Sequence, residues 1–260
     1  MLQLGIVTYN IAKDWDLPTI LQKLEALGYG GVELRTTHRH GVEVGLSAEA
    51  RREVRRRFED SPVELVGLGS AFEYHSADPA EVRRQIDATK EYVRLAHDVG
   101  ALGVKVRPNG VPKGEAPESA FRRIGDALRE VGEDAEGQGV EIRVEVHGAG
   151  TSEWPGFARI IEHANHPNVG VCWNSNPQDV PKGGTSIAAN YKLVAGKVRT
   201  VHLRDLTDEA YPWRELFQLL AADGFDGFTM AEIPDSPDAD RVLRYFRSLW
   251  LAYQPEGAAR

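Results

Sequence analysis

The regular alternation of short apolar runs with longer amphipathic segments constrains the fold of this chain most strongly. We count eight runs of strand length, separated by segments with apolar residues at helical spacing, such as "AEVRRQIDATKEYVRLAHDVG". Eight such units in 260 residues is the count of a closed (β/α)8 barrel, although a doubly wound open sheet would share part of the pattern. The predicted strands cover residues 3–9, 30–35, 64–70, 103–108, 141–147, 168–174, 197–205 and 227–233.

The connections between these segments favour the barrel over the open sheet. Those that lead from a predicted helix into the next strand are short, such as "GYGG" and "DGFDG", whereas several that leave a strand are long and polar, such as "TTHRHGVEVGLS" and "NSNPQDVPKGGTS". In barrel enzymes the loops after the strands build the site, and the opposite loops serve stability. Because no low-complexity segment divides the chain, we expect one α/β domain over residues 1–260, a single (β/α)8 TIM barrel.

Composition limits the partners that this chain can have. The net charge of -8 argues against a nucleic-acid surface. No apolar stretch approaches the ~18 residues of a membrane span, and the N-terminus lacks a signal-peptide pattern. The single cysteine, Cys172, lies in an apolar run and is expected to be a buried, inert thiol. These features favour a cytoplasmic protein that handles small molecules, without nucleic-acid or membrane partners.

Charged residues alternate with aliphatic ones in the predicted strand at 141–147. Barrel strands face the helices and the lumen in turn, and the aliphatic phase belongs against the helices, so Arg143, Glu145 and His147 should point inward. The last predicted strand leads to Glu232, but parity does not decide its direction because Phe228 and Met230 share its phase. The same parity argument turns further polar residues inward on other strands: Glu33, Arg35, Lys105, Arg107, Asn174, Thr200, His202 and Arg204.

Several charges that converge on one barrel mouth require an explanation, because an unpaired buried charge is costly. A network of structural Arg–Glu pairs is one explanation, and for Arg143, the deepest residue, it is the favoured one. For Glu145, His202 and Glu232 together a metal site is favoured. Carboxylates and an imidazole without cysteine suit a divalent cation such as Mn2+, Mg2+ or Co2+.

Five short motifs at the predicted strand ends carry a family resemblance: "GGVELR", "VEVHG", "VCWNSNP", "VHLRD" and "MAEIP". With them the chain resembles the sugar phosphate isomerase/epimerase superfamily, which has the xylose isomerase-like TIM barrel, over essentially its whole length. The resemblance implies one divalent metal ion held by Glu145, Asn174, His202 and Glu232. It also implies that Glu145 and Glu232 form the catalytic acid/base pair.

Asn174 departs from this pattern, because the family has Asp at that position. An amide oxygen can still bind a metal, but the loss of one negative charge weakens metal affinity and puts full occupancy in doubt. Asn176, two residues further along, could instead take part, or the two amides could hold substrate hydroxyls.

The function that the resemblance implies is a metal-dependent isomerase or epimerase that acts on a sugar or sugar phosphate by proton transfer through an enediolate. Loss of a β-hydroxyl from the same intermediate would give an inosose dehydratase-like lyase. A carbohydrate-binding barrel without catalysis is the alternative from another class, and Asn174 keeps it open. The sequence does not choose among these outcomes.

Inward-pointing polar residues at the mouth are candidates for binding a small carbohydrate. Four of them are cationic, which hints at a phosphorylated or acidic substrate, but an equally good alternative is that they pair with Glu33 and neighbouring acids. The resemblance makes a homodimer or homotetramer plausible, while "FRSLWLAY" near the C-terminus is as well explained by a last helix that packs on the barrel. The substrate-binding candidates are Glu33, Lys105, Arg107, His147, Asn176 and Arg204.

Overall fold

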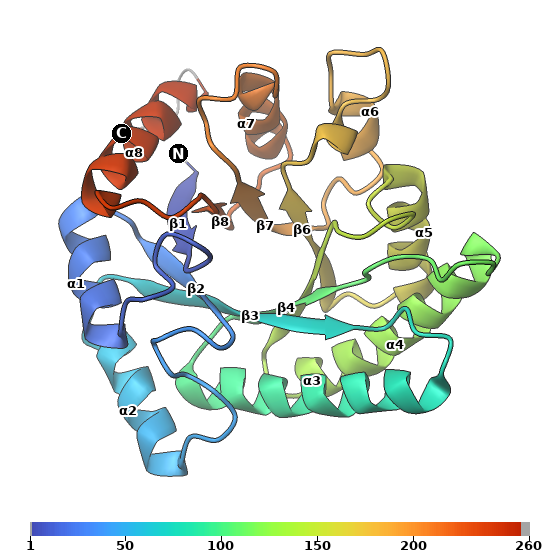
Figure 1. The fold of residues 1–260 in the computed structure, drawn as a ribbon, viewed down its shortest axis with the longest axis horizontal. Coiled ribbons are helices and arrows are strands. Elements are labelled where there is room, and N and C mark those ends of the chain that lie inside the picture. Colours follow the sequence, from blue (N-terminus) through green and yellow to red (C-terminus); the bar gives the residue numbers. More distant parts are fainter. Residues whose placement is uncertain (1, 256–260) are drawn as a thin grey trace.

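Eight parallel strands close into a barrel within residues 2–255, the part of the chain that the computed structural model describes (Figure 1). Each strand pairs with its neighbour in chain order, and β8 closes the sheet onto β1. The predicted fold class is therefore confirmed. The strands are β1 (Gln3–Val7), β2 (Gly31–Arg35), β3 (Glu64–Glu73), β4 (Gly103–Arg107), β5 (Glu141–Glu145), β6 (Val169–Asn174), β7 (Val198–Leu203) and β8 (Phe228–Ala231).

Helices surround the strands and cover their outer faces (Figure 1). Local signals begin and end them: Asp16 accepts a hydrogen bond from the backbone of Thr19 at the start of the first helix, and Gly28, at φ 73°, ends it in the left-handed region. None of the helices between residues 2 and 255 has the length and apolar content to cross a membrane. The helices are α1 (Leu17–Leu27), α2 (Ala48–Glu59), α3 (Pro79–Val99), α4 (Pro117–Glu136), α5 (Trp154–Ala164), α6 (Ala188–Tyr191), α7 (Trp213–Ala222) and α8 (Ala239–Tyr253).

The main hydrophobic core lies between the strands and the helices. Ile142 and Val144 of β5 belong to it and are fully buried, as are Val201 and Leu203 of β7. The aliphatic phase of these strands therefore faces the helices, and the alternate phase faces the lumen. Several predicted strands extend beyond the observed ones, because the chain turns into the mouth loops soon after Glu145 on β5 and Leu203 on β7.

A second, smaller apolar cluster fills the inside of the barrel. It consists of Val7, Val66, Phe228 and Met230, and we call it the lumen plug. Gly5 leaves room for it, since a Cβ added there would lie 2.6 Å from the Met230 sulfur. Phe228 and Met230 therefore share the inward phase of β8, and this phase directs Glu232 toward the mouth.

Arg143 lies toward the opposite end of the barrel from the mouth, where it lines a pocket together with Glu141. Its Nη1 donates to the carbonyl oxygen of Val66 at 2.7 Å, and its Nη2 lies 2.8 Å from Oε2 of Glu141. Gly103 on the neighbouring strand makes this possible, because a Cβ there would lie 2.7 Å from Nε of Arg143. The structure thus shows the structural pair that the sequence favoured for this residue.

Candidate metal centre

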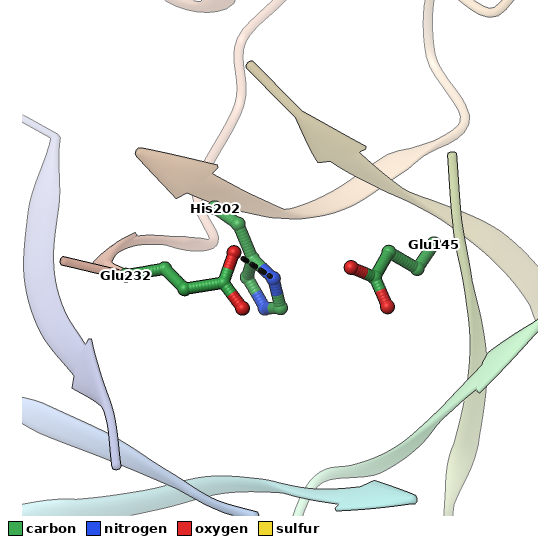
Figure 2. Close-up of side chains that lie close together, drawn as sticks. All are labelled: Glu145, His202 and Glu232. Atoms are coloured by element: carbon green, nitrogen blue, oxygen red, sulfur yellow. Dashed lines mark ion pairs between the residues drawn. The ribbon is translucent and has the colours of Figure 1, made fainter. Parts of the chain in front are cut away.

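Three potential metal ligands converge at the open mouth of the barrel. Glu145 ends β5, His202 lies on β7 and Glu232 follows β8 directly. One possible ligand atom from each of them lies within 4.8 Å of the other two. Figure 2 shows the two carboxylates reaching in from opposite sides with the imidazole close to Glu232, whose Oε2 lies 3.6 Å from His202 Nδ1. This arrangement brings together the set that the sequence predicted.

Asn174 and His202 supply an independent test of whether a cation fits here. The two residues are register partners on β6 and β7. Asn174 Oδ1 and His202 Nδ1 are both buried, and neither has a hydrogen-bond partner among residues 2–255. Buried polar atoms are normally paired, because an unpaired one costs about 1–3 kcal/mol. A divalent cation accepts electron pairs from an amide oxygen and an imidazole nitrogen alike, so these residues fit such an ion.

Glu33 contacts the imidazole of His202 at Nε2, the nitrogen across the ring from Nδ1. Its Oε2 lies 3.3 Å from His202 Nε2, and both side chains are essentially unexposed. Gly69 gives this carboxylate its space, because a Cβ there would lie 2.7 Å from Glu33 Oε1. A carboxylate on the far nitrogen is the usual support of a metal-binding histidine, since it leaves the other nitrogen free for the metal. A direct substrate contact by Glu33 stays a prediction.

Lys105 lies inside the same centre, paired with Glu145. Its Nζ is 2.5 Å from Glu145 Oε2, while Asn174 Nδ2 donates to Oε1 of the same carboxylate at 3.1 Å. Burial by itself would raise the pKa of Glu145, but the Lys105 ammonium outweighs it and lowers this pKa to about 2. Burial likewise opposes the charged form of Lys105, yet Glu145 and Glu33 raise its pKa. Both partners are therefore charged at neutral pH.

For His202 and Glu33, too, burial and neighbouring charges act on the pKa in opposite directions. Burial opposes protonation of the imidazole, but Cys172, Glu33 and Glu232 together raise its pKa well above the ordinary value, so a cation that used Nδ1 would have to displace a proton from it. Burial also disfavours the ionised form of Glu33, and His202 and Lys105 outweigh that effect, so the pKa of Glu33 is lowered. The mouth of the barrel thus holds buried carboxylates that remain ionised because cations lie beside them.

The remaining predicted substrate residues lie around the mouth but do not form a single cationic surface. Arg107 pairs with Glu73. His147 Nδ1 lies 2.7 Å from Asn109 Oδ1, and Asn176 Nδ2 donates to the carbonyl of Val146 at 2.9 Å. Lys105 and Arg107 therefore show the alternative that the sequence left open, pairing with neighbouring acids, and substrate contacts by all these residues stay predictions.

Arg204 differs from Lys105 and Arg107, because it faces a pocket. Together with Glu232 and Tyr9 it lines a pocket of about 380 Å³ at the mouth. Its Nε is buried and has no hydrogen-bond partner within the described part of the chain. Asp205 and Asp208 line the same pocket, so the surroundings of Arg204 are of mixed charge.

Sequence reasoning missed a buried acid close to this centre. Asp179 lies in a 3-10 turn, Pro177–Asp179, after β6. Its carboxylate accepts hydrogen bonds from Tyr211 Oη at 2.6 Å, Trp154 Nε1 at 2.9 Å and the backbone N–H of Asn176 at 3.1 Å. Burial raises the pKa of Asp179 to about 7, although these donors lower it in part. The carboxyl thereby joins the start of α5 to the loops after β6 and β7. The Asn-Pro-Gln-Asp spacing, a capping-box pattern, was the signal that could have revealed it.

Comparison with known proteins agrees with this architecture. Residues 21–249 match the family model described as xylose isomerase-like TIM barrel, and the chain belongs to this family. No curated protein matches the chain significantly.

Solved structures share the fold at low sequence identity. A structure of the IolI protein with zinc superimposes with a TM-score of 0.80 at 17% identity, covering 97% of this chain and 98% of that one. D-psicose 3-epimerase from Clostridium cellulolyticum H10, solved with D-tagatose, gives 0.80 at 14% identity, with 98% and 100% covered. The probable 3-DHS dehydratase AsbF from Bacillus anthracis gives 0.75 at 12% identity, with 96% and 99% covered.

Proposed function

We propose that this protein is a divalent-metal-dependent isomerase or epimerase of a small carbohydrate. The observation that carries the proposal is the convergence of Glu145, His202 and Glu232 at the barrel mouth, with Asn174 hydrogen-bonded to Glu145 beside them. Asn174 Oδ1 and His202 Nδ1 are buried and have no hydrogen-bond partner among residues 2–255. The similarity to an epimerase and to a zinc-containing protein of the same fold supports the class of reaction.

The metal's contribution would be that of a Lewis acid. When bound by these four residues, Mn2+, Mg2+ or Co2+ polarises a carbonyl and the adjacent hydroxyl of the sugar and makes the neighbouring C–H more acidic. Glu33 keeps His202 oriented for this purpose through its 3.3 Å contact with Nε2. Asn174 supplies a neutral oxygen, so the ligand set carries two negative charges, on Glu145 and Glu232.

Glu145 and Glu232 are placed to move the proton. Their carboxylates approach from opposite sides of the space between them (Figure 2). Glu145 is ionised at neutral pH, so it is available to remove the proton, and Glu232 can return one to the other face of the resulting enediolate. Return to the same carbon gives epimerisation, and return to the adjacent carbon gives aldose–ketose isomerisation.

A dehydratase is the second candidate. The same enediolate can expel a β-hydroxyl, as an inosose dehydratase-like lyase would, and the shared fold with the probable dehydratase AsbF favours keeping this outcome. Arg204, which lines the mouth pocket with Glu232, supports a phosphorylated or otherwise acidic sugar as substrate. The net charge of -8 favours a small molecule over a nucleic acid.

Metal content and proton exchange test the proposal together. Elemental analysis of the protein equilibrated with excess MnCl2 should find one divalent ion per chain, lost in Glu232→Gln and retained in the control Glu73→Gln, whose carboxylate pairs with Arg107 outside the centre. The loaded protein should exchange a sugar C–H proton with deuterated water, followed by NMR across ketoses and sugar phosphates.

Two results would contradict the proposed function. A native protein without metal, but with metal uptake in Asn174→Asp, would contradict the enzyme and point to the carbohydrate-binding barrel. Metal that persists in Glu232→Gln would mean that the ion binds elsewhere.

A further inference from the structure

The Lys105 ammonium occupies a position inside the candidate metal centre. Lys105 and Glu145 are only 5% and 6% exposed, and Nζ lies 2.5 Å from Glu145 Oε2. The second oxygen, Oε1, receives the amide N–H of Asn174 at 3.1 Å. Both oxygens of the carboxylate are therefore already used by donors of the protein itself.

The same ammonium is also linked to the rest of the centre. Its direct contact is with Glu145, and this carboxylate belongs to the same converging group as His202 and Glu232. A divalent ion that used Glu145 would lie near this ammonium in a buried, poorly screened environment, where like charges repel strongly. The ion would have to share Glu145 with Lys105 or move the ammonium away from it.

Asn174 also stabilises Glu145 in the absence of a metal ion. Its side chain is neutral, and its N–H stabilises Glu145 without any metal. An aspartate in its place would set a second carboxylate beside Oε1 and would require a cation between them. Lys105 and Asn174 thus both lessen the need of Glu145 for an external cation.

We propose that Lys105 is a built-in counter-cation that competes with the divalent metal for Glu145 and so keeps the metal affinity of this centre low. The inference rests on the proposed metal-dependent function and adds the residue that regulates metal loading. Lys105 is accordingly a positioning residue for Glu145, and its influence is felt in metal binding before any substrate is present.

Titration of the metal-free protein with MnCl2, followed by calorimetry or by the electron paramagnetic resonance of free Mn2+, tests this role. Lys105→Met removes the charge at similar length and should bind Mn2+ at least about tenfold more tightly than the wild type. Lys105→Arg keeps the charge and should keep the low affinity. Lys90→Met is the matched control, because Lys90 pairs with Glu130 between outer helices, 2.7 Å from its Oε1.

Thermal unfolding supplies a second measurement in case Lys105→Met folds poorly. Lys105→Gln keeps a neutral donor for Glu145, and saturating Mn2+ should raise its melting temperature more than that of the wild type. Equal or weaker Mn2+ binding in both neutral variants, with the wild type still binding, would overturn the role of Lys105 alone. Failure of the wild type and of every variant to bind a divalent ion would overturn the metal-dependent function as well.

Discussion

Glu145 and Asp179 are buried carboxyl groups at the same end of the barrel, yet their pKa values move in opposite directions. Burial raises the pKa of both. For Glu145 the Lys105 ammonium, 2.5 Å away, reverses that effect and brings the pKa to about 2. For Asp179 the partners include the neutral donors Tyr211 and Trp154, and the pKa remains raised, at about 7. The charge of the contacting groups, rather than the depth of burial, separates the two acids.

Under the proposed function, this difference separates a candidate metal ligand from a structural group. Glu145 stays ionised, but its two oxygens contact Lys105 and Asn174, so a cation would have to share the carboxylate with them. Asp179 has three donors on its carboxylate and joins the start of α5 to two loops. Substitutions that exchange or remove their partners test the distinction.

The largest effect is expected at Glu145. Glu145→Leu leaves the buried Lys105 without its closest counter-charge, and we expect the free energy of unfolding to fall by about 3–5 kcal/mol. The double variant Lys105→Met/Glu145→Leu removes both charges and should recover most of that loss. Urea denaturation of the two variants and the wild type measures both values. A single variant as stable as the wild type would show that the pair contributes nothing to stability.

A smaller effect is expected at Asp179. Asp179→Ala leaves Trp154 Nε1 and Tyr211 Oη buried without their acceptor, which should cost about 2–3 kcal/mol. Mn2+ affinity should remain that of the wild type, because Asp179 is not among the converging ligands. Denaturation at pH 5 and a Mn2+ titration give the two readouts. Loss of Mn2+ binding in a folded Asp179→Ala protein would mean that the two regions are coupled.

The smallest effect, counted over one pH unit, is the dependence of the free energy of unfolding on pH. The pKa of Asp179 is about 7 in the folded chain and near 3.8 when unfolded, so its protonated form stabilises the fold below pH 3.8 and this contribution is lost as the pH rises toward 7. Relative to Asp179→Asn, the wild type should lose at most about 1.4 kcal/mol per pH unit across this window. Parallel pH profiles of the two proteins, measured by urea denaturation, would disagree with the raised pKa.

The sequence predicted the barrel and much of the centre, because the aliphatic face of each strand is visible in the order of its residues. This logic correctly turned Glu145 and His202 inward. It did not decide Glu232, since Phe228 and Met230 occupy lumen space opened by glycines on neighbouring strands. The order of residues within one strand also does not show which side chains of other strands it contacts.

The contacts that define the chemistry depend on register and on loops. The pairing of Lys105 with Glu145 joins neighbouring strands, while the contact of Glu33 with His202 joins residues 169 positions apart. Asp179 escaped notice because it lies in a loop, where no periodic pattern indicates burial. The roles assigned to the site residues stay predictions until the variants are measured.

The lumen plug of Val7, Val66, Phe228 and Met230 determines from which side the candidate centre can be reached. These side chains are at most 4% exposed and fill the barrel between the Arg143 end and the mouth. The candidate centre therefore lies on the mouth side of this apolar cluster. Under the proposed function, a sugar and a metal ion would therefore reach the centre from the mouth side, because these apolar side chains occupy the interior on the other side.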